Sequence, residues 1–168
     1  EAWQAQSDSY MMNGALTQLV RINRGCVIEE AHMRNRSLIA HWCLAQAEYW
    51  GRCFNMSPAL ELIKRDGKTY LRINDYITLR QYVGQLLAEI QRIKSEGDFA
   101  AAKTLVERYA VNVDADLHKE MLSRYEALHL SPYKGFVNPV YTPVTDAEGH
   151  ITDITVSYDE EFDEQQLR

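Results

Sequence analysis

Apolar residues recur every three to four positions through most of the first 130 residues, which is the spacing of one face of an α-helix. In the third periodic segment the expected apolar stripe contains Leu79, Val83, Leu86, Leu87, Ile90 and Ile93. The periodicity predicts helices over about 2–21, 28–49, 75–94, 98–109 and 114–130.

Residues with capping chemistry stand at the ends of these segments. Gly25 is expected to end the first helix and Gly97 the third, because glycine accepts the left-handed backbone that follows a helix. Short polar side chains at the starts can accept hydrogen bonds from free backbone N–H groups. The expected N-caps are Asn74 or Asp75, Asp98, and Asp114 or Asp116.

Two regions break the helical pattern. Asp66–Gly67 separates two alternating runs, and this dipeptide is typical of a tight hairpin turn, here over about 62–73. Residues 131–143 contain three of the four prolines and are expected to be extended. A turn over 146–149 and a β-branched strand over 151–158 follow, and residues 159–168 form an acidic end that is expected to be mobile. The predicted fold class is therefore mainly α (α+β), helical over 1–130 with a small hairpin and with a C-terminal extended/β pair over 131–158.

Bulk composition narrows the functional class. The chain of 168 residues is 46% hydrophobic and 25% charged, which is typical of one globular domain. A net charge of −6 without a basic stripe argues against a nucleic-acid partner. No apolar run approaches the length of a membrane span, so no membrane partner is expected.

The three cysteines are Cys26, Cys43 and Cys53, an odd number without metal-ligand spacing. We expect all three to be free thiols that behave as small buried apolar residues. A reducing compartment, and hence a cytoplasmic location, fits this cysteine usage.

Known catalytic motifs are missing from the sequence. The five histidines include no H-E-x-x-H pair, and no cysteines and histidines share zinc-finger spacing, so no metal site is expected within this chain. There is no G-x-S-x-G elbow and no glycine-rich phosphate loop.

The segment 28–42 contains the most distinctive polar residues. On a helix, its apolar stripe would comprise Ile28, Ala31, Leu38, Ile39 and Trp42. His32 is expected just inside the edge of that stripe and Arg36 just beyond it, whereas Arg34 and His41 would project toward solvent on the opposite side. Spacing alone leaves two readings open: a structural histidine beside a cation, or a pair that donates hydrogen bonds to a carbonyl or oxyanion.

Several long blocks resemble the C-terminal part of the dipeptidyl peptidase III family, especially its bacterial members. They are S-Y-M-M-N-G-A-L-T-Q-L-V-R-I, E-E-A-H-M-R-N-R-S-L-I-A-H-W, R-D-G-K-T-Y-L-R-I-N-D-Y, L-L-A-E-I-Q-R-I-K-S-E-G-D and P-Y-K-G-F-V-N-P-V-Y-T-P-V. The blocks occur in the family's order and extend from about Ser9 to Tyr158, nearly the whole chain.

The resemblance implies a two-lobed zinc metallopeptidase that removes dipeptides from the N-terminus of oligopeptides. The family's zinc ligands lie in an H-E-x-x-x-H motif and a later glutamate-bearing helix, and neither is present here. The chain would then be a C-terminal fragment of the catalytic region, inactive alone, whose zinc and remaining substrate groove come from the missing N-terminal and zinc-binding regions.

Three residues match positions that line the cleft in the family. His32 matches the histidine that hydrogen-bonds the scissile carbonyl or its oxyanion, and Arg36 matches the arginine that helps to hold the substrate. Lys134 corresponds to a basic residue of the C-terminal extended segment that reaches the substrate. The alternative is a non-catalytic helical interaction module that shares ancestry with the peptidase. If the chain is a fragment of the peptidase, the apolar surface that it exposes could support a homodimer.

Overall fold

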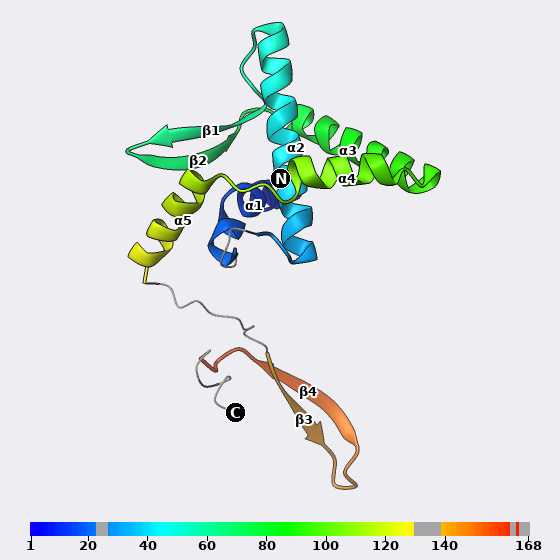
Figure 1. The fold of residues 1–168 in the computed structure, drawn as a ribbon. Helices are drawn as coiled ribbons and strands as arrows, with labels where there is room; N and C mark the ends of the chain where they lie inside the picture. The colour runs from blue at the N-terminus through cyan, green and yellow to red at the C-terminus, as the bar shows by residue number, and fades with distance from the viewer. Residues whose placement is uncertain (23–26, 130–138, 162–163, 165–168) are drawn as a thin grey trace. The chain divides into compact units, whose positions relative to one another are not determined.

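The computed structural model describes residues 1–22, 27–129, 139–161 and 164, which group into two compact units, Glu1–His129 and Leu130–Arg168. The first unit is mostly helical and the second contains a β-hairpin (Figure 1). A mainly α architecture with two small antiparallel hairpins is thereby confirmed. The elements are α1 (Ala2–Ala15), the 3₁₀ helix η1 (Thr17–Arg21), α2 (Ala31–Phe54), β1 (Leu60–Arg65), β2 (Lys68–Ile73), α3 (Tyr76–Glu96), α4 (Phe99–Tyr109), α5 (Ala115–Ala127), β3 (Val140–Thr145) and β4 (Ile151–Ser157).

Helix α2 runs through the first unit and packs against α1, α3, α4 and β1 (Figure 1). Small side chains on α2, among them Cys43 and Ala47, have no exposed surface and let neighbouring elements approach closely. Larger apolar residues from the surrounding elements fill the core around them. The largest contributors are Met11, Leu16, Leu19, Leu60, Leu79, Tyr82 and Met121.

The predicted helix caps are present. Asp75 accepts hydrogen bonds from the backbone N–H groups of Ile77 (2.9 Å) and Thr78 (3.2 Å), which selects Asp75 over Asn74. Asp98 caps α4 and Asp114 caps α5 in the same way. Gly97 ends α3 with a φ of 66°, as expected, whereas the predicted helix end at Gly25 lies outside the described residues.

The first hairpin forms at the predicted dipeptide. Asp66 (φ 48°) and Gly67 (φ 73°) both adopt left-handed backbone, which matches the right-handed twist of the flanking strands. Helix α5 then fastens β2: both carboxylate oxygens of Glu120 accept hydrogen bonds from Thr69, one from its N–H and one from its hydroxyl, each at 2.6 Å. Arg124 donates to the Thr69 carbonyl at 2.6 Å.

Several helical details differ from the sequence prediction. The first helix ends at Ala15 and continues only as η1, and α2 begins at Ala31 because Glu30 caps it, accepting from the N–H groups of His32 and Met33. Helix α2 also continues to Phe54, beyond the predicted end near residue 49. In α3, Leu87 is 56% exposed, and Tyr82 occupies the buried face that Leu87 was expected to share.

The second unit is the antiparallel pair β3–β4, joined by the predicted turn over residues 146–149. The strand containing Pro143 is extended as expected, while residues 131–138 of the predicted extended segment lie outside the described part. Cross-strand partners share a face, so Tyr141 with Val156 and Pro143 with Ile154 form one apolar side of the hairpin. No helix in the described ranges is long and apolar enough to cross a membrane.

Candidate functional site

His32 and Arg36 lie in the first two turns of α2 and line one pocket of about 370 Å³. Helices α1 and α3 contribute Tyr10 and Ile90 to its walls, and Asn35, Leu38 and Ile39 complete the lining. His32 is exposed and Arg36 is half-buried, which reverses the predicted order of burial. The reversal follows from the start of α2: His32 is only the second helical residue, so no preceding turn covers it.

The helix start at this pocket is held by Glu30. Its carboxylate accepts from His32 N at 2.8 Å and from Met33 N at 3.0 Å. The hydrogen bond from the His32 N–H is the main reason that the pKa of Glu30 is lowered, and the charges of His32 and Arg36 lower it further. Within the described part of the chain, neither the His32 ring nor the Arg36 guanidinium hydrogen-bonds another residue.

His41 does not face solvent, contrary to the prediction. Its Nδ1 lies 2.9 Å from Ser37 Oγ and 3.1 Å from the carbonyl oxygen of Tyr109, at the contact between α2 and α4. Burial lowers the pKa of His41, and hydrogen bonds to the backbone of Tyr109 and of Ser37 partly oppose the shift. The satisfied structural histidine of α2 is therefore His41, while Arg34 is exposed as predicted.

The remaining predicted residues fall in different places. Lys134 and Cys26 lie outside the described residues. Cys43 is buried, and burial raises the pKa of its thiol to about 12. Cys53 is a free thiol but is exposed, contrary to the expectation that it packs in the core, because α2 extends beyond the helices that cover its earlier turns.

Metal binding finds no support from residue clustering. Among the described residues, no three histidine, cysteine, aspartate or glutamate side chains come close enough to hold a metal ion. The zinc that the family resemblance implies would need ligands from other parts of a longer chain.

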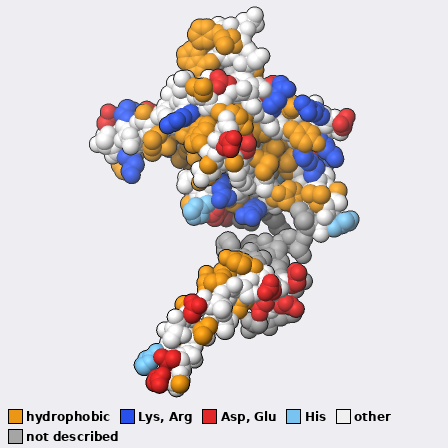
Figure 2. All heavy atoms as spheres, turned by 180° about the vertical axis from the view of Figure 1, so that it is seen from behind, with side chains coloured by type: hydrophobic (Ala, Val, Ile, Leu, Met, Phe, Trp, Pro, Cys, Tyr) orange, Lys and Arg blue, Asp and Glu red, His pale blue; other side chains and the backbone are white. Residues whose placement is uncertain are grey.

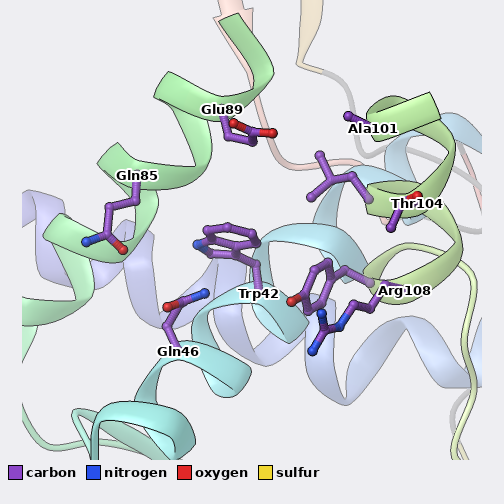
Figure 3. A pocket seen from close by; sticks show the side chains of 9 residues that line it. Trp42, Gln46, Gln85, Glu89, Ala101, Thr104 and Arg108 are labelled. Carbon is purple, nitrogen blue, oxygen red and sulfur yellow. The ribbon is translucent and has the colours of Figure 1, made fainter. Parts of the chain in front are cut away.

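A larger pocket of about 550 Å³, which the sequence did not reveal, lies between α2, α3 and α4 (Figure 3). Trp42 lies at its centre, with Gln46 from the same helix beside it. Gln85 and Glu89 project from α3, and α4 contributes a further wall that includes Arg108. The pocket joins residues that are distributed between Trp42 and Tyr109 in the sequence, which is why no local motif signals it.

Comparison with known proteins gives no function for either pocket. No protein-family model matches the chain. No curated protein matches it either.

Proposed function

We propose that this chain is the C-terminal part of a zinc-dependent exopeptidase of the dipeptidyl peptidase III kind, which releases dipeptides from the N-terminus of oligopeptides. The observation that carries the proposal is the placement of His32 and Arg36: the two residues that match the family's H-x-x-x-R helix line the same pocket. Neither side chain forms a hydrogen bond or an ion pair with another described residue, so both can bond to a peptide. The sequence blocks from about Ser9 to Tyr158 support the same assignment.

Each residue has a distinct role in this proposal. The exposed His32 ring donates a hydrogen bond to the scissile carbonyl and stabilises the negative charge that develops on its oxygen. Arg36 is half-buried in the pocket lining, and its guanidinium orients the peptide through paired hydrogen bonds. Lys134 adds a second cation for substrate binding. Zinc, held by regions outside this sequence, supplies Lewis-acid activation of the carbonyl.

Kinetics of the parent enzyme test the proposal. His32→Ala is expected to lower kcat by about 10²–10³-fold, because oxyanion donors act mainly in the transition state. Arg36→Ala is expected to raise KM as well. Arg34→Ala is the matched control, since Arg34 is an exposed cation on the same turns of α2 that does not line the pocket. A His32→Ala enzyme with nearly normal kcat contradicts the assignment.

A second experiment concerns the chain alone. With added zinc it is expected to show no turnover of dipeptidyl-arylamide substrates, because it brings no ligand set together in its described residues. Clear turnover would defeat the assignment of the zinc site to a missing region.

Both described cysteines are unpaired, which suits the cytoplasmic location that we propose for the parent.

The alternative function is a non-catalytic interaction module, and one observation favours it. Tyr49, Trp50, Phe54 and Met56 are exposed at the C-terminal end of α2, where hydrophobic side chains gather on the surface (Figure 2). The rings of Trp50 and Phe54 are stacked 5.5 Å apart. The open reading frame distinguishes the two functions: an upstream H-E-x-x-x-H in frame supports the peptidase, and its absence supports the module.

A further inference from the structure

The 550 Å³ pocket between α2, α3 and α4 has a fixed aromatic floor. Trp42 donates its indole N–H to the carbonyl oxygen of Tyr82 at 3.0 Å, which holds the ring in place. Tyr109 meets Trp42 edge to face, with ring centroids 5.4 Å apart and an interplanar angle of 71°. Leu105 lies beside them in the lining. The floor is therefore a rigid apolar surface on which a planar or bulky side chain can pack.

Polar groups with unused hydrogen-bonding capacity surround this floor. Tyr109 is only 9% exposed, yet its hydroxyl forms no hydrogen bond with any described residue. The same holds for the side-chain amides of Gln46 and Gln85, which project beside Trp42 (Figure 3). Gln46 is half-buried and Gln85 is exposed, so these groups line an open site in which a ligand would meet both donors and acceptors.

The two charged residues of the lining, Glu89 and Arg108, differ in how they are paired. Arg92 donates two hydrogen bonds, of 3.0 Å and 2.7 Å, to the carboxylate of Glu89, but it also pairs with Glu96 and Asp98, so the negative charge on this side of the pocket is only partly offset. Arg108 contacts the ring of Tyr109, with its guanidinium carbon 5.2 Å from the ring centroid, but pairs with no carboxylate in the described ranges. The pocket therefore presents one cation that is free to bind a planar anion in a bidentate manner.

We propose that this pocket binds the C-terminal end of a peptide whose last residue is aromatic or large and apolar. That side chain packs on Trp42 and Leu105, and its terminal carboxylate pairs with Arg108. The amides of Gln46 and Gln85 bond the last peptide group, which offers one N–H and one carbonyl. Three of the nine lining residues, Gln85, Thr104 and Arg108, are exposed, which suits a chain end that enters from solvent. The site is separate from the His32 pocket and does not depend on the peptidase assignment.

Two small probes distinguish the contribution of the aromatic ring to binding from that of the carboxylate. N-acetyl-phenylalanine carries both the ring and the carboxylate, whereas N-acetyl-phenylalaninamide keeps the ring and lacks the charge. Titration of the full chain is followed by proton–nitrogen correlation spectra, in which the Trp42 indole N–H is assigned with Trp42→Phe. The acid is expected to shift the Trp42 signal saturably and to bind about tenfold more tightly than the amide, the scale of one charge-assisted pair.

Variants test the role of the cation. Arg108→Gln is expected to remove the preference for the acid and to leave binding of the amide unchanged. Arg80→Gln is the control, because Arg80 is an exposed arginine on α3 that does not line the pocket. Tyr109→Phe is expected to weaken both probes if the variant keeps the dispersed spectrum of the folded chain. The proposal is overturned if the acid produces no saturable shift at Trp42, if acid and amide bind equally, or if Arg108→Gln and Arg80→Gln behave alike.

Discussion

Gly14 of α1 lies directly against the main-chain carbonyl of Arg36 in α2. A Cβ atom at this position would collide with that carbonyl and would lie 2.7 Å from Cβ of Ala40. The helix that carries His32 and Arg36 therefore rests on α1 at a point where a side chain does not fit. This contact places the pocket's two candidate residues relative to Tyr10, which comes from the same helix as Gly14.

Gly14→Ala is expected to lower the free energy of unfolding by about 1–3 kcal/mol, because the added methyl group forces the two helices apart. Urea denaturation followed by tryptophan fluorescence measures the loss, since all three tryptophans lie in the first unit. Gly84→Ala is the control: Gly84 is also helical, but its added Cβ meets nothing within 4 Å. That substitution is expected to stabilise the chain by about 0.5–1 kcal/mol through its helix propensity alone. Equal effects of the two variants contradict this account.

Glu120→Gln is expected to cost about 1–2 kcal/mol at neutral pH, because one of two charge-assisted hydrogen bonds to Thr69 is lost and the other is weakened. These bonds are also the main reason that the pKa of Glu120 is lowered in the folded chain. A lowered carboxyl pKa contributes stability above the unfolded pKa that disappears as the pH falls through the folded pKa. The difference between the variant and the natural chain should therefore shrink in acid. Glu126→Gln, on an exposed part of the same helix, is the control, and a difference that is constant with pH argues against the prediction.

His41 is a basic group and Glu120 an acidic one, yet His41 too is expected to make the chain less stable as the pH falls. Burial lowers its pKa below the ordinary 6.5, so the unfolded chain binds a proton at a pH where the folded chain does not. Stability is therefore expected to fall as the pH drops from about 7.5 to about 5.5, a range above most carboxyl titrations. His41→Asn should flatten this slope, because an amide can still donate to the Tyr109 carbonyl but does not titrate. His150→Asn, which removes an exposed histidine, is the control, and an unchanged slope in His41→Asn would count against the prediction.

The thiols are expected to react at different rates. In a Cys26→Ser background, an aromatic disulfide reagent should modify Cys53 rapidly, because that thiol is exposed. Cys43 should react only when the chain unfolds, since it has no exposed surface and its thiol pKa is raised to about 12. Adding Cys53→Ser should remove the fast phase and leave the slow one. A fast phase that survives Cys53→Ser shows that α2 opens around Cys43 in the folded state.

The elements that the sequence predicted well depend on residues close together in the chain. Asp66–Gly67 forms its hairpin because both residues tolerate positive φ, and Asp75, Asp98 and Gly97 act on backbone groups within a few positions. The i, i+4 spacing of His32 and Arg36 likewise placed both on one side of a helix. Such interactions depend on nearby residues and little on the rest of the chain.

Burial on a helix with several neighbours could not be predicted in this way. Helix α2 meets at least four other elements, so a single apolar stripe does not describe it, and His41 is half-buried where it contacts the carbonyl of Tyr109, 68 residues further along the chain. The same reason explains the exposed Leu87 and the unpredicted pocket at Trp42. The amino-acid sequence alone determined the helices, the turns and the candidate pair, because these follow from local backbone and side-chain chemistry. Only the tertiary structure decided which polar side chains remain available to a ligand, because that depends on segments brought together by folding.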